Sequence, residues 1–222
     1  MKKPNKTRSL SVRVKTAKGR KISSTLWLNR QLNDPYVTMA RKEGYRSRAI
    51  YKFIQIDEKF KFLQPQKKLL DLGAAPGGWS QWAVRKLGKS NVMAIDISDM
   101  EPIDGCLILK QDIYAENTLE LIQAWQPMVD IVVSDMAASS SGHTDTDHIR
   151  IVNLCRAAYE MAVKVLNIDG VFVAKILKGG TEDSLLKEIK NSFKVVKHFK
   201  PDASRAGSAE SYIIAMGFKG NE

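Results

Sequence analysis

From residue 68 onward, short apolar runs alternate with longer amphipathic segments, and this alternation constrains the fold more than any other feature of the chain. The runs are almost continuously apolar, which is typical of strands buried on both faces of a parallel sheet. Strands that alternate with helices form a sheet covered by helices on both faces. The sequence therefore predicts an α/β fold with strands at 68–72, 91–95, 106–109, 129–134, 170–176, 193–199 and 211–217.

Four helices are predicted between these strands, at 78–87, 116–126, 147–167 and 181–192. The last two strands follow each other without a helix, so we expect them to pair in antiparallel fashion at one edge. The predicted architecture is a seven-stranded, mostly parallel sheet with helices on both faces and an antiparallel edge strand.

The segment before the sheet is helical in pattern and precedes a single folded domain, predicted at 23–222. Ser23 and Ser24 are suitable N-caps for a short helix, and a second helix follows the breaker Asn33-Asp34-Pro35. A third helical pattern covers about 46–60. We divide the domain into an N-terminal helical extension, 23–62, and a core, 68–218.

The positive charge of the chain is concentrated at its N-terminus. Residues 1–30 hold ten basic residues and no acidic one, out of a formal net charge of +11. Residues 1–22 are therefore predicted to be a flexible basic arm that binds a polyanion, with an organelle transit peptide as the alternative. Phosphate contacts from such an arm supply affinity that weakens with salt, and they supply no sequence choice.

Membrane and metal chemistry are not indicated. No run approaches the roughly 18 apolar residues that a membrane-spanning helix needs. Cys106 and Cys155 lie in apolar contexts without the spacing of metal ligands, and His143, His148 and His198 have no such spacing either. We expect a cytoplasmic protein with reduced cysteines and no metal site.

The stretch LLDLGAAPGGWSQW, residues 69–82, is a strand, a Gly-rich turn and the start of a helix. It lacks the dinucleotide pattern GxGxxG, and it has no Gly-Lys-Ser/Thr of a P-loop. Ligands of open α/β sheets bind at such loops, outside the carboxyl ends of the strands. Asp71 suits a positive centre such as an amino-acid ammonium group, and Gly77 and Gly78 permit a close approach.

Two further acids end the next two strand regions. Asp96 can accept hydrogen bonds from ribose hydroxyls, and Asp112 can accept one from an adenine amine. Three acids at successive strand ends favour S-adenosylmethionine over a dinucleotide, which needs a pyrophosphate site. The alternative is that the three acids only cap loops and helices.

Lys175 interrupts the apolar run VFVAKIL, residues 171–177. An unpaired ammonium group in an apolar site costs several kcal/mol, so this lysine must have a partner, have a shifted pKa, or lie at the end of its strand. A lysine that merely extends its charged end to solvent is the alternative.

Six blocks of the chain, in this order, resemble the FtsJ/RrmJ (RlmE) family of ribose 2′-O-methyltransferases. They are SRAIYK (47–52), DLGAAPGGWSQ (71–81), AIDI (94–97), SDMA (134–137), VFVAKIL (171–177) and KPDASRAGSAESYIIA (200–215). The resemblance covers about residues 23–218 and implies a Rossmann-like methyltransferase fold. It also implies a catalytic tetrad, which maps onto Lys52, Asp135, Lys175 and Glu210, with Lys175 as the general base or as the cation that polarises the ribose hydroxyl. One departure is SDMAASSSGH, where the family often has SDMAPN, so that Ala138 and Ser139 replace a proline and an asparagine.

The expected sites follow from the turn, the strand ends and this resemblance. Cofactor contacts are expected at Asp71, Gly73, Ala74, Pro76, Gly77, Gly78, Trp79, Asp96, Ile97, Asp112, Ile113 and Asp135. RNA contacts are expected at Arg41, Lys42, Arg46, Arg48 and Arg205.

The resemblance implies a monomeric enzyme that uses S-adenosylmethionine, releases S-adenosylhomocysteine and methylates a uridine ribose in the A-loop of 23S rRNA, on the large ribosomal subunit. Related enzymes act on tRNA or mRNA caps, and the residues alone leave those substrates open. A ribosome-assembly factor that binds RNA without catalysis is the alternative of another class. A nicotinamide-dependent oxidoreductase is disfavoured because GxGxxG is missing.

Overall fold

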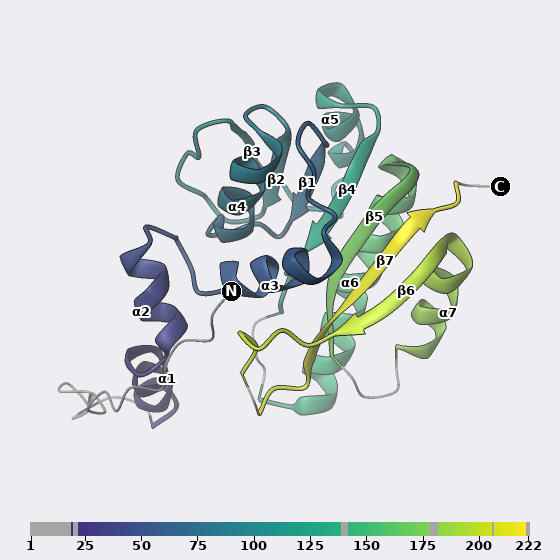
Figure 1. Cartoon of the computed structure of the whole chain (residues 1–222). Helices are drawn as coiled ribbons and strands as arrows, with labels where there is room; N and C mark the ends of the chain where they lie inside the picture. Colours follow the sequence, from purple (N-terminus) through teal and green to yellow (C-terminus); the bar gives the residue numbers. More distant parts are fainter. Residues whose placement is uncertain (1–18, 20–21, 139–141, 178–181, 206, 221–222) are drawn as a thin grey trace.

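A mixed sheet occupies the middle of the protein. The computed structural model describes residues 19, 22–138, 142–177, 182–205 and 207–220, and within them the sheet has seven strands in the order β3-β2-β1-β4-β5-β7-β6 (Figure 1). The strands are β1 Leu69–Leu72, β2 Val92–Asp96, β3 Cys106–Lys110, β4 Val129–Ser134, β5 Leu166–Leu177, β6 Phe193–Phe199 and β7 Glu210–Phe218. The predicted arm lies outside the described residues, apart from Gly19 and Ile22.

The strand directions confirm the predicted mostly parallel sheet. β1 pairs in parallel with β2 and β4, and the pairs β2–β3 and β4–β5 are also parallel. β7 is antiparallel to both of its neighbours, β5 and β6. The predicted antiparallel pair is therefore present at this edge, and β7 lies one place inside it, between β5 and the outermost strand.

The boundary between the helix predicted at 147–167 and the strand predicted at 170–176 differs from the sequence prediction. The helix expected to reach residue 167 ends at Val165, and the next strand begins at Leu166 instead of residue 170. Leu166 pairs with Val129 of β4, after which the register shifts. Asp169 adopts a left-handed φ of 64° within this irregular stretch. Residues 167–170, which have the composition of a breaker, are thus accommodated inside a long strand as an irregularity.

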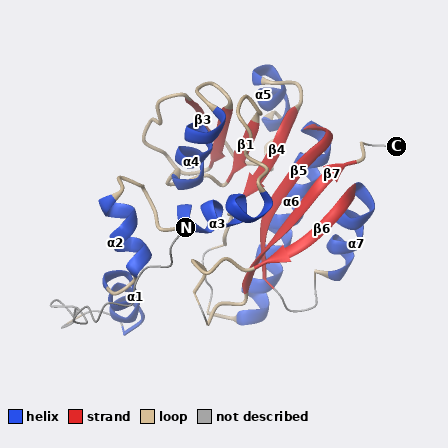
Figure 2. Cartoon of the chain, viewed as in Figure 1, coloured by secondary structure: helices blue, strands red, loops and turns tan. Residues whose placement is uncertain are grey.

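Helices cover both faces of the sheet (Figure 2). One core holds α5, α6 and α7 against side chains such as Leu70, Phe172 and Ile213. The other holds α3 and α4 against the alternate side chains, including Val133 and Ile214. This alternation follows from the two-residue period of a strand. The helices are α1 Ile22–Leu32, α2 Pro35–Lys42, α3 Ile50–Phe60, α4 Gly78–Leu87, α5 Thr118–Trp125, α6 Thr144–Val165 and α7 Asp183–Ser192.

The N-terminal helices differ in how they join this core. Phe53 and Ile56 of α3 are fully buried against the sheet, so α3 is part of the core and not an appendage. α1 and α2 lie together at one side of the sheet (Figure 1), and α2 contacts the rest through Tyr36 and Ala40. In the described part of the chain, no helix has the length and apolar character needed to cross a membrane.

Candidate active site at the carboxyl edge of the sheet

A cavity of about 510 Å³ opens at the carboxyl ends of β1, β2, β3 and β4. Six of the residues predicted to bind a cofactor line it: Gly73, Asp96, Ile97, Asp112, Ile113 and Asp135. Other lining residues were not predicted, among them Ala75, Ser98, Gln111, Tyr114, Met136, Ala137 and Leu154. Ile97 and Tyr114 are 68% and 63% exposed, which is high for apolar and aromatic walls. The cavity therefore offers uncovered apolar surface next to carboxylates, as a nucleoside site requires.

Asp96 holds the loops on two sides of this cavity. Its Oδ2 accepts the main-chain N–H of Ala75 at 2.9 Å, and its Oδ1 accepts that of Ser98 at 2.8 Å. Asp112 Oδ1 accepts the N–H of Tyr114 at 3.0 Å. Each carboxylate oxygen has two lone pairs, so both acids retain acceptor capacity for the hydroxyl and amine groups of a ligand. The two acids therefore order their loops and remain able to bind a ligand.

Gly73 is required by a close contact at the end of β1. Its φ is 73°, and a Cβ at this position would lie 2.1 Å from Cγ of Met136, which follows β4. An alanine would therefore be strained and would displace Met136 from the cavity wall. The loop after β4 is the one that departs from the family pattern. Ala138 is described there, whereas Ser139 lies outside the described residues.

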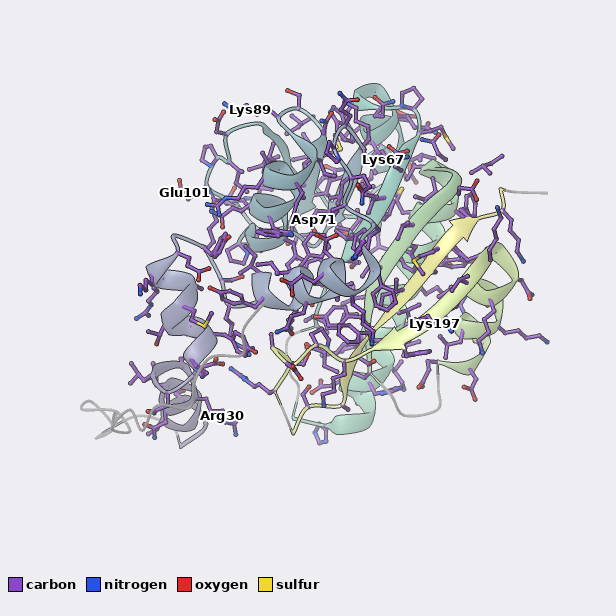
Figure 3. The ribbon with its side chains drawn as sticks, in the orientation of Figure 1. Arg30, Lys67, Asp71, Lys89, Glu101 and Lys197 are labelled. Carbon is purple, nitrogen blue, oxygen red and sulfur yellow. The ribbon has the colours of Figure 1, made fainter. Side chains whose placement is uncertain are left out.

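Asp71 is more enclosed than the other two strand-end acids. Its side chain is 1% exposed, does not line the cavity, and accepts a hydrogen bond from Ser80 Oγ at 2.6 Å. Figure 3 shows it in the interior of the molecule, whereas Arg30 and Lys89 lie at the periphery. Burial raises the pKa of Asp71 to about 7, and the negative charges of Asp135 and Asp96 act in the same direction. The predicted contact of Asp71 with a cationic group stays a prediction.

This raised pKa predicts a pH-dependent loss of stability. Between its ordinary value of 3.8 and about 7, the folded protein holds the Asp71 proton and the unfolded chain does not, so stability falls as the pH rises. We expect Asp71→Asn to remove this fall, which amounts to roughly 2–3 kcal/mol between about pH 5 and pH 7.5. Urea unfolding of both proteins at the two pH values measures it. Asp104→Asn, at an exposed ion pair, is the control. Equal pH dependence in wild type and Asp71→Asn would contradict the prediction.

The second half of the Gly-rich turn faces the N-terminal segment instead of the cavity. A Cβ on Gly77, whose φ is 103°, would lie 2.8 Å from Ile103 and 3.2 Å from Nη1 of Arg46. A Cβ on Gly78 would lie 2.7 Å from Oγ of Ser47. The close approach that these glycines permit is therefore to protein, not to a ligand in the cavity.

Three other residues predicted to contact the cofactor, Ala74, Pro76 and Trp79, also lie outside the cavity lining. Ala74 is buried, and the exposed Pro76 directs its carbonyl towards Arg46. The Trp79 indole stacks on Phe53 with ring centroids 4.4 Å apart and donates to the carbonyl of Ala49. The Trp79 ring thus packs in the core and does not line the cavity, where its predicted contact with the cofactor would be made.

Beside the cavity, Lys175 has the partner that its buried position demands. Its Nζ donates to the main-chain carbonyl of Asp135 at 2.6 Å and to Oδ1 of the same residue at 3.0 Å. The lysine is 7% exposed. β4 and β5 are adjacent and parallel, so their carboxyl ends bring these two side chains together. Lys175 is therefore an ion-paired lysine at the active edge, and the alternative of a solvent-directed side chain is wrong.

Lys52 and Glu210 extend this pair into a chain of four charged groups. Lys52 Nζ lies 2.8 Å from Oε2 of Glu210 and 3.8 Å from Oδ2 of Asp135. Lys52 comes from α3 and Glu210 from the first position of β7. The structure thus brings together all four residues of the predicted tetrad, from α3, β5, β7 and the loop that follows β4. The Glu210 carboxylate is held by Lys52 and Ser204.

The charges around Asp135 determine its ionisation. Burial tends to raise the pKa of Asp135, but the ammonium groups of Lys175 and Lys52 and the Tyr212 hydroxyl outweigh it and hold the pKa below its ordinary value. Asp135 is consequently a carboxylate at neutral pH. A fixed negative charge therefore faces two ammonium groups at the edge of the cavity.

Sequence reasoning missed two members of this network. Tyr212 donates its hydroxyl hydrogen to Asp135 Oδ1 at 2.7 Å, and Ser204 Oγ donates to Glu210 Oε1 at 2.7 Å. Tyr212 lies two residues after Glu210 on β7, and this period places both side chains on one face of the strand. That spacing was a usable signal for Tyr212. Ser204 had none, because its position depends on how the loop after β6 folds back.

The predicted RNA contacts divide into two groups. Arg41, Lys42 and Arg205 are exposed and remain available to a polyanion. Arg48 is instead tied to Asp34 at 2.7 Å and to the carbonyl of Ala203, and the Arg46 guanidinium donates to three main-chain carbonyls. Arg46 and Arg48 thus have structural partners, which sequence spacing could not reveal.

Comparison with known proteins places this geometry among methyltransferases. Residues 45–218 match the family of FtsJ-like methyltransferases. Two relatives are named Ribosomal RNA large subunit methyltransferase E. The one from Paramagnetospirillum magneticum is 50% identical over 97% of this chain and 91% of its own length, and the one from Rickettsia akari is 52% identical over 96% of each. A crystal structure described as a ribosomal RNA methyltransferase of Plasmodium falciparum is 29% identical, with a TM-score of 0.70 over 80% of this chain and all of that one.

Proposed function

The chain belongs to the FtsJ-like methyltransferase family, and we propose that it transfers a methyl group from S-adenosylmethionine to a ribose 2′-oxygen of large-subunit ribosomal RNA. The proposal includes the finer assignment to a uridine of the A-loop in 23S rRNA. The names of its relatives support the rRNA substrate, and the chemistry of the active edge supports the ribose hydroxyl.

One observation supports the reaction above all others: Asp135 belongs to both halves of the site. It lines the cavity, and it is bonded to Lys175. A methyl donor in the cavity and a hydroxyl group held by Lys175 would therefore meet at one carboxylate. Such proximity replaces a bimolecular encounter by an oriented one, which accounts for much of enzymatic acceleration.

The cavity residues fit the proposed cofactor. Asp96 and Asp112 offer carboxylate oxygens for ribose hydroxyls and an adenine amine, and Ile97, Ile113 and Tyr114 offer uncovered side chains on which a base can pack. S-adenosylmethionine supplies a methyl group that its sulfonium centre has already activated. The work left to the protein is to bind, to exclude water and to prepare the hydroxyl.

Lys175 is the residue that we assign to the hydroxyl group. In its ion pair with Asp135, the ammonium group would donate to the 2′-oxygen, fix its direction and stabilise negative charge that develops there, while the hydroxyl proton is released to solvent. A neutral amine at the same position would accept the hydroxyl proton. Asp135 and Tyr212 orient Lys175, and Lys52 with Glu210 balances the charge of Asp135.

We further propose that residues 23–222 act as one catalytic unit, that the protein works as a monomer in the cytoplasm, and that the basic arm binds rRNA. Arg41, Lys42 and Arg205, which are exposed, would extend that basic surface on the folded part. These contacts are electrostatic and would make RNA affinity depend strongly on salt.

Methyl transfer tests the proposal directly. The protein is incubated with methyl-labelled S-adenosylmethionine and either large ribosomal subunits, tRNA or mRNA, and the labelled RNA is then hydrolysed in alkali. We expect label in 23S rRNA, in dinucleotides that resist alkali, because a 2′-O-methyl group prevents cleavage of the adjacent phosphodiester.

Each other result has a defined meaning. Alkali-resistant label in tRNA alone would support the proposed 2′-O-methylation and contradict the proposed rRNA substrate. Label that alkali releases in mononucleotides would move the reaction from the ribose to a base. An absence of label from every RNA, with S-adenosylhomocysteine bound tightly, would favour the non-catalytic assembly factor.

A further inference from the structure

The Arg46 side chain joins three parts of the molecule that are distant in sequence. Its Nη1 donates to the carbonyls of Glu101 at 2.6 Å and Pro76 at 3.2 Å, and its Nη2 donates to the carbonyl of Pro102 at 2.7 Å. Its main-chain N–H donates to Oε1 of Gln81 on α4 at 3.0 Å. A guanidinium group satisfies such a set because its five N–H donors have a fixed planar geometry.

The carbonyls that Arg46 binds belong to the two loops that bound the cavity. Pro76 lies in the Gly-rich turn, whose Gly73 and Ala75 line the cavity. Glu101 and Pro102 lie in the β2–β3 loop, whose Ile97 and Ser98 line it. Figure 3 shows Glu101 at the outer side of this loop. Arg46 therefore clamps the two loops from outside the cavity.

Asp96 joins the same loops from the cavity side. Its carboxylate accepts the N–H groups of Ala75 and Ser98, one from each loop. The loops are thus held by an anion that binds their N–H groups and by a cation that binds their carbonyls. The glycines of the turn allow the two loops and the N-terminal segment to approach this closely. A Cβ on Gly77 would clash with Ile103, Met100 and Arg46, and a Cβ on Gly78 would clash with Ser47.

From these contacts we propose that Arg46 is a positioning residue for cofactor binding, and that it acts by fixing the distance between the Gly-rich turn and the β2–β3 loop. The inference rests on the proposed function, because it assumes that the cavity binds S-adenosylmethionine. Arg46 is not one of the residues that line the cavity; its side chain binds the loop that presents Ile97 and Ser98. Without it, those loop residues must be ordered when the ligand binds, and the lost freedom is subtracted from affinity.

This role differs from the RNA contact that sequence spacing suggested for the same residue. A phosphate contact needs positive charge and tolerates lysine, whereas three carbonyls held at once need the planar fork of a guanidinium. Arg46→Lys therefore separates the two roles, because it keeps the charge and removes the fork. Arg41→Ala is the matched control, at an exposed arginine of α2.

The experiment measures the affinity for S-adenosylhomocysteine by calorimetry and the affinity for a 23S rRNA fragment by filter binding, on the full chain. For Arg46→Lys we expect cofactor binding about 10- to 30-fold weaker, which corresponds to roughly 1.4–2 kcal/mol, with RNA binding within twofold of wild type. For Arg41→Ala we expect the reverse: unchanged cofactor affinity and weaker RNA binding. Gln81→Ala, which removes the acceptor of the Arg46 main-chain N–H together with an exposed 3.4 Å hydrogen bond to the carbonyl of Gly44, should weaken cofactor binding by about threefold.

Unchanged cofactor affinity in folded Arg46→Lys would overturn the inference, as would weaker RNA binding without a change in cofactor affinity. If Arg46→Lys does not fold, Gln81→Ala decides, and wild-type cofactor affinity in that variant would count against the inference. A wild-type protein that binds no S-adenosylhomocysteine would refute the proposed function itself, so the two failures are distinguishable.

Discussion

Lys175→Ala is expected to lower the rate of methyl transfer by about 10²–10⁴-fold, the usual contribution of a positioned acid–base group. The variant loses the only nitrogen that β5 places against Asp135, and no described neighbour on that strand can replace it. Asp96, Asp112 and the Gly-rich turn are unchanged, so the affinity for S-adenosylhomocysteine should stay within about twofold. Single-turnover transfer to large ribosomal subunits, with calorimetry of the same protein, measures both quantities.

Lys194→Ala is a suitable control for this variant. Lys194 lies on β6, and its ion pair with Asp169 is largely exposed. The Lys194→Ala variant should transfer methyl groups at the wild-type rate. Exposed ion pairs contribute little to stability, and β6 is an edge strand that is not adjacent to β4 or β5. Activity of Lys175→Ala within tenfold of wild type would remove Lys175 from the reaction and leave the four-residue network as a structural feature.

Asp135→Asn is expected to affect stability as well as activity. The substitution keeps the shape of the side chain but leaves the ammonium groups of Lys175 and Lys52 without their shared carboxylate, in positions that are 7% and 9% exposed. Removing one partner of a buried pair costs about 3–5 kcal/mol, and we expect the lower end because Glu210 still compensates Lys52. Transfer should fall by at least about 100-fold, since Lys175 loses the group that orients it.

Urea unfolding and its pH dependence check this expectation. The pKa of Asp135 is held below its ordinary value of 3.8, so its contribution to stability is fully present above that value and is lost as the pH falls through the lowered one. The stability difference between wild type and Asp135→Asn should therefore shrink in acid. Asp104→Asn, whose pair with Lys89 is exposed, should lose less than about 1 kcal/mol. A similar small loss for Asp135→Asn would mean that the buried network does not depend on this carboxylate.

The order of the helices and strands could be predicted from the sequence because it depends on local pattern. Buried strands are continuous apolar runs, and helices show a different period, so each element is visible within its own window. The positions of Asp96 and Asp112 followed from the same logic, because parallel strands end at one edge of a sheet. Asp135 was predicted from the resemblance to the FtsJ/RrmJ family. Lys175 was conspicuous because an ammonium group inside an apolar run requires a partner.

Other features depended on which distant segments meet. Pairing between distant strands places β7 between β5 and β6. Pairing with β4 also lets β5 continue across residues 167–170, where the sequence predicted a break between a helix and a strand. The same is true of Ser204 at Glu210, which the fold of a loop brings into place.

Arg46 and the Gly-rich turn show the distinction most clearly. The sequence by itself determined that a glycine turn and a nearby cluster of cations exist, because both are properties of residue type and order. Only the tertiary structure decided that Gly77 and Gly78 approach Arg46 and Ser47, and that Arg46 binds carbonyls instead of facing a polyanion. The physical reason is that a hydrogen bond depends on a separation of about 3 Å, and only the packing of the whole chain sets that separation for residues 30 to 56 positions apart.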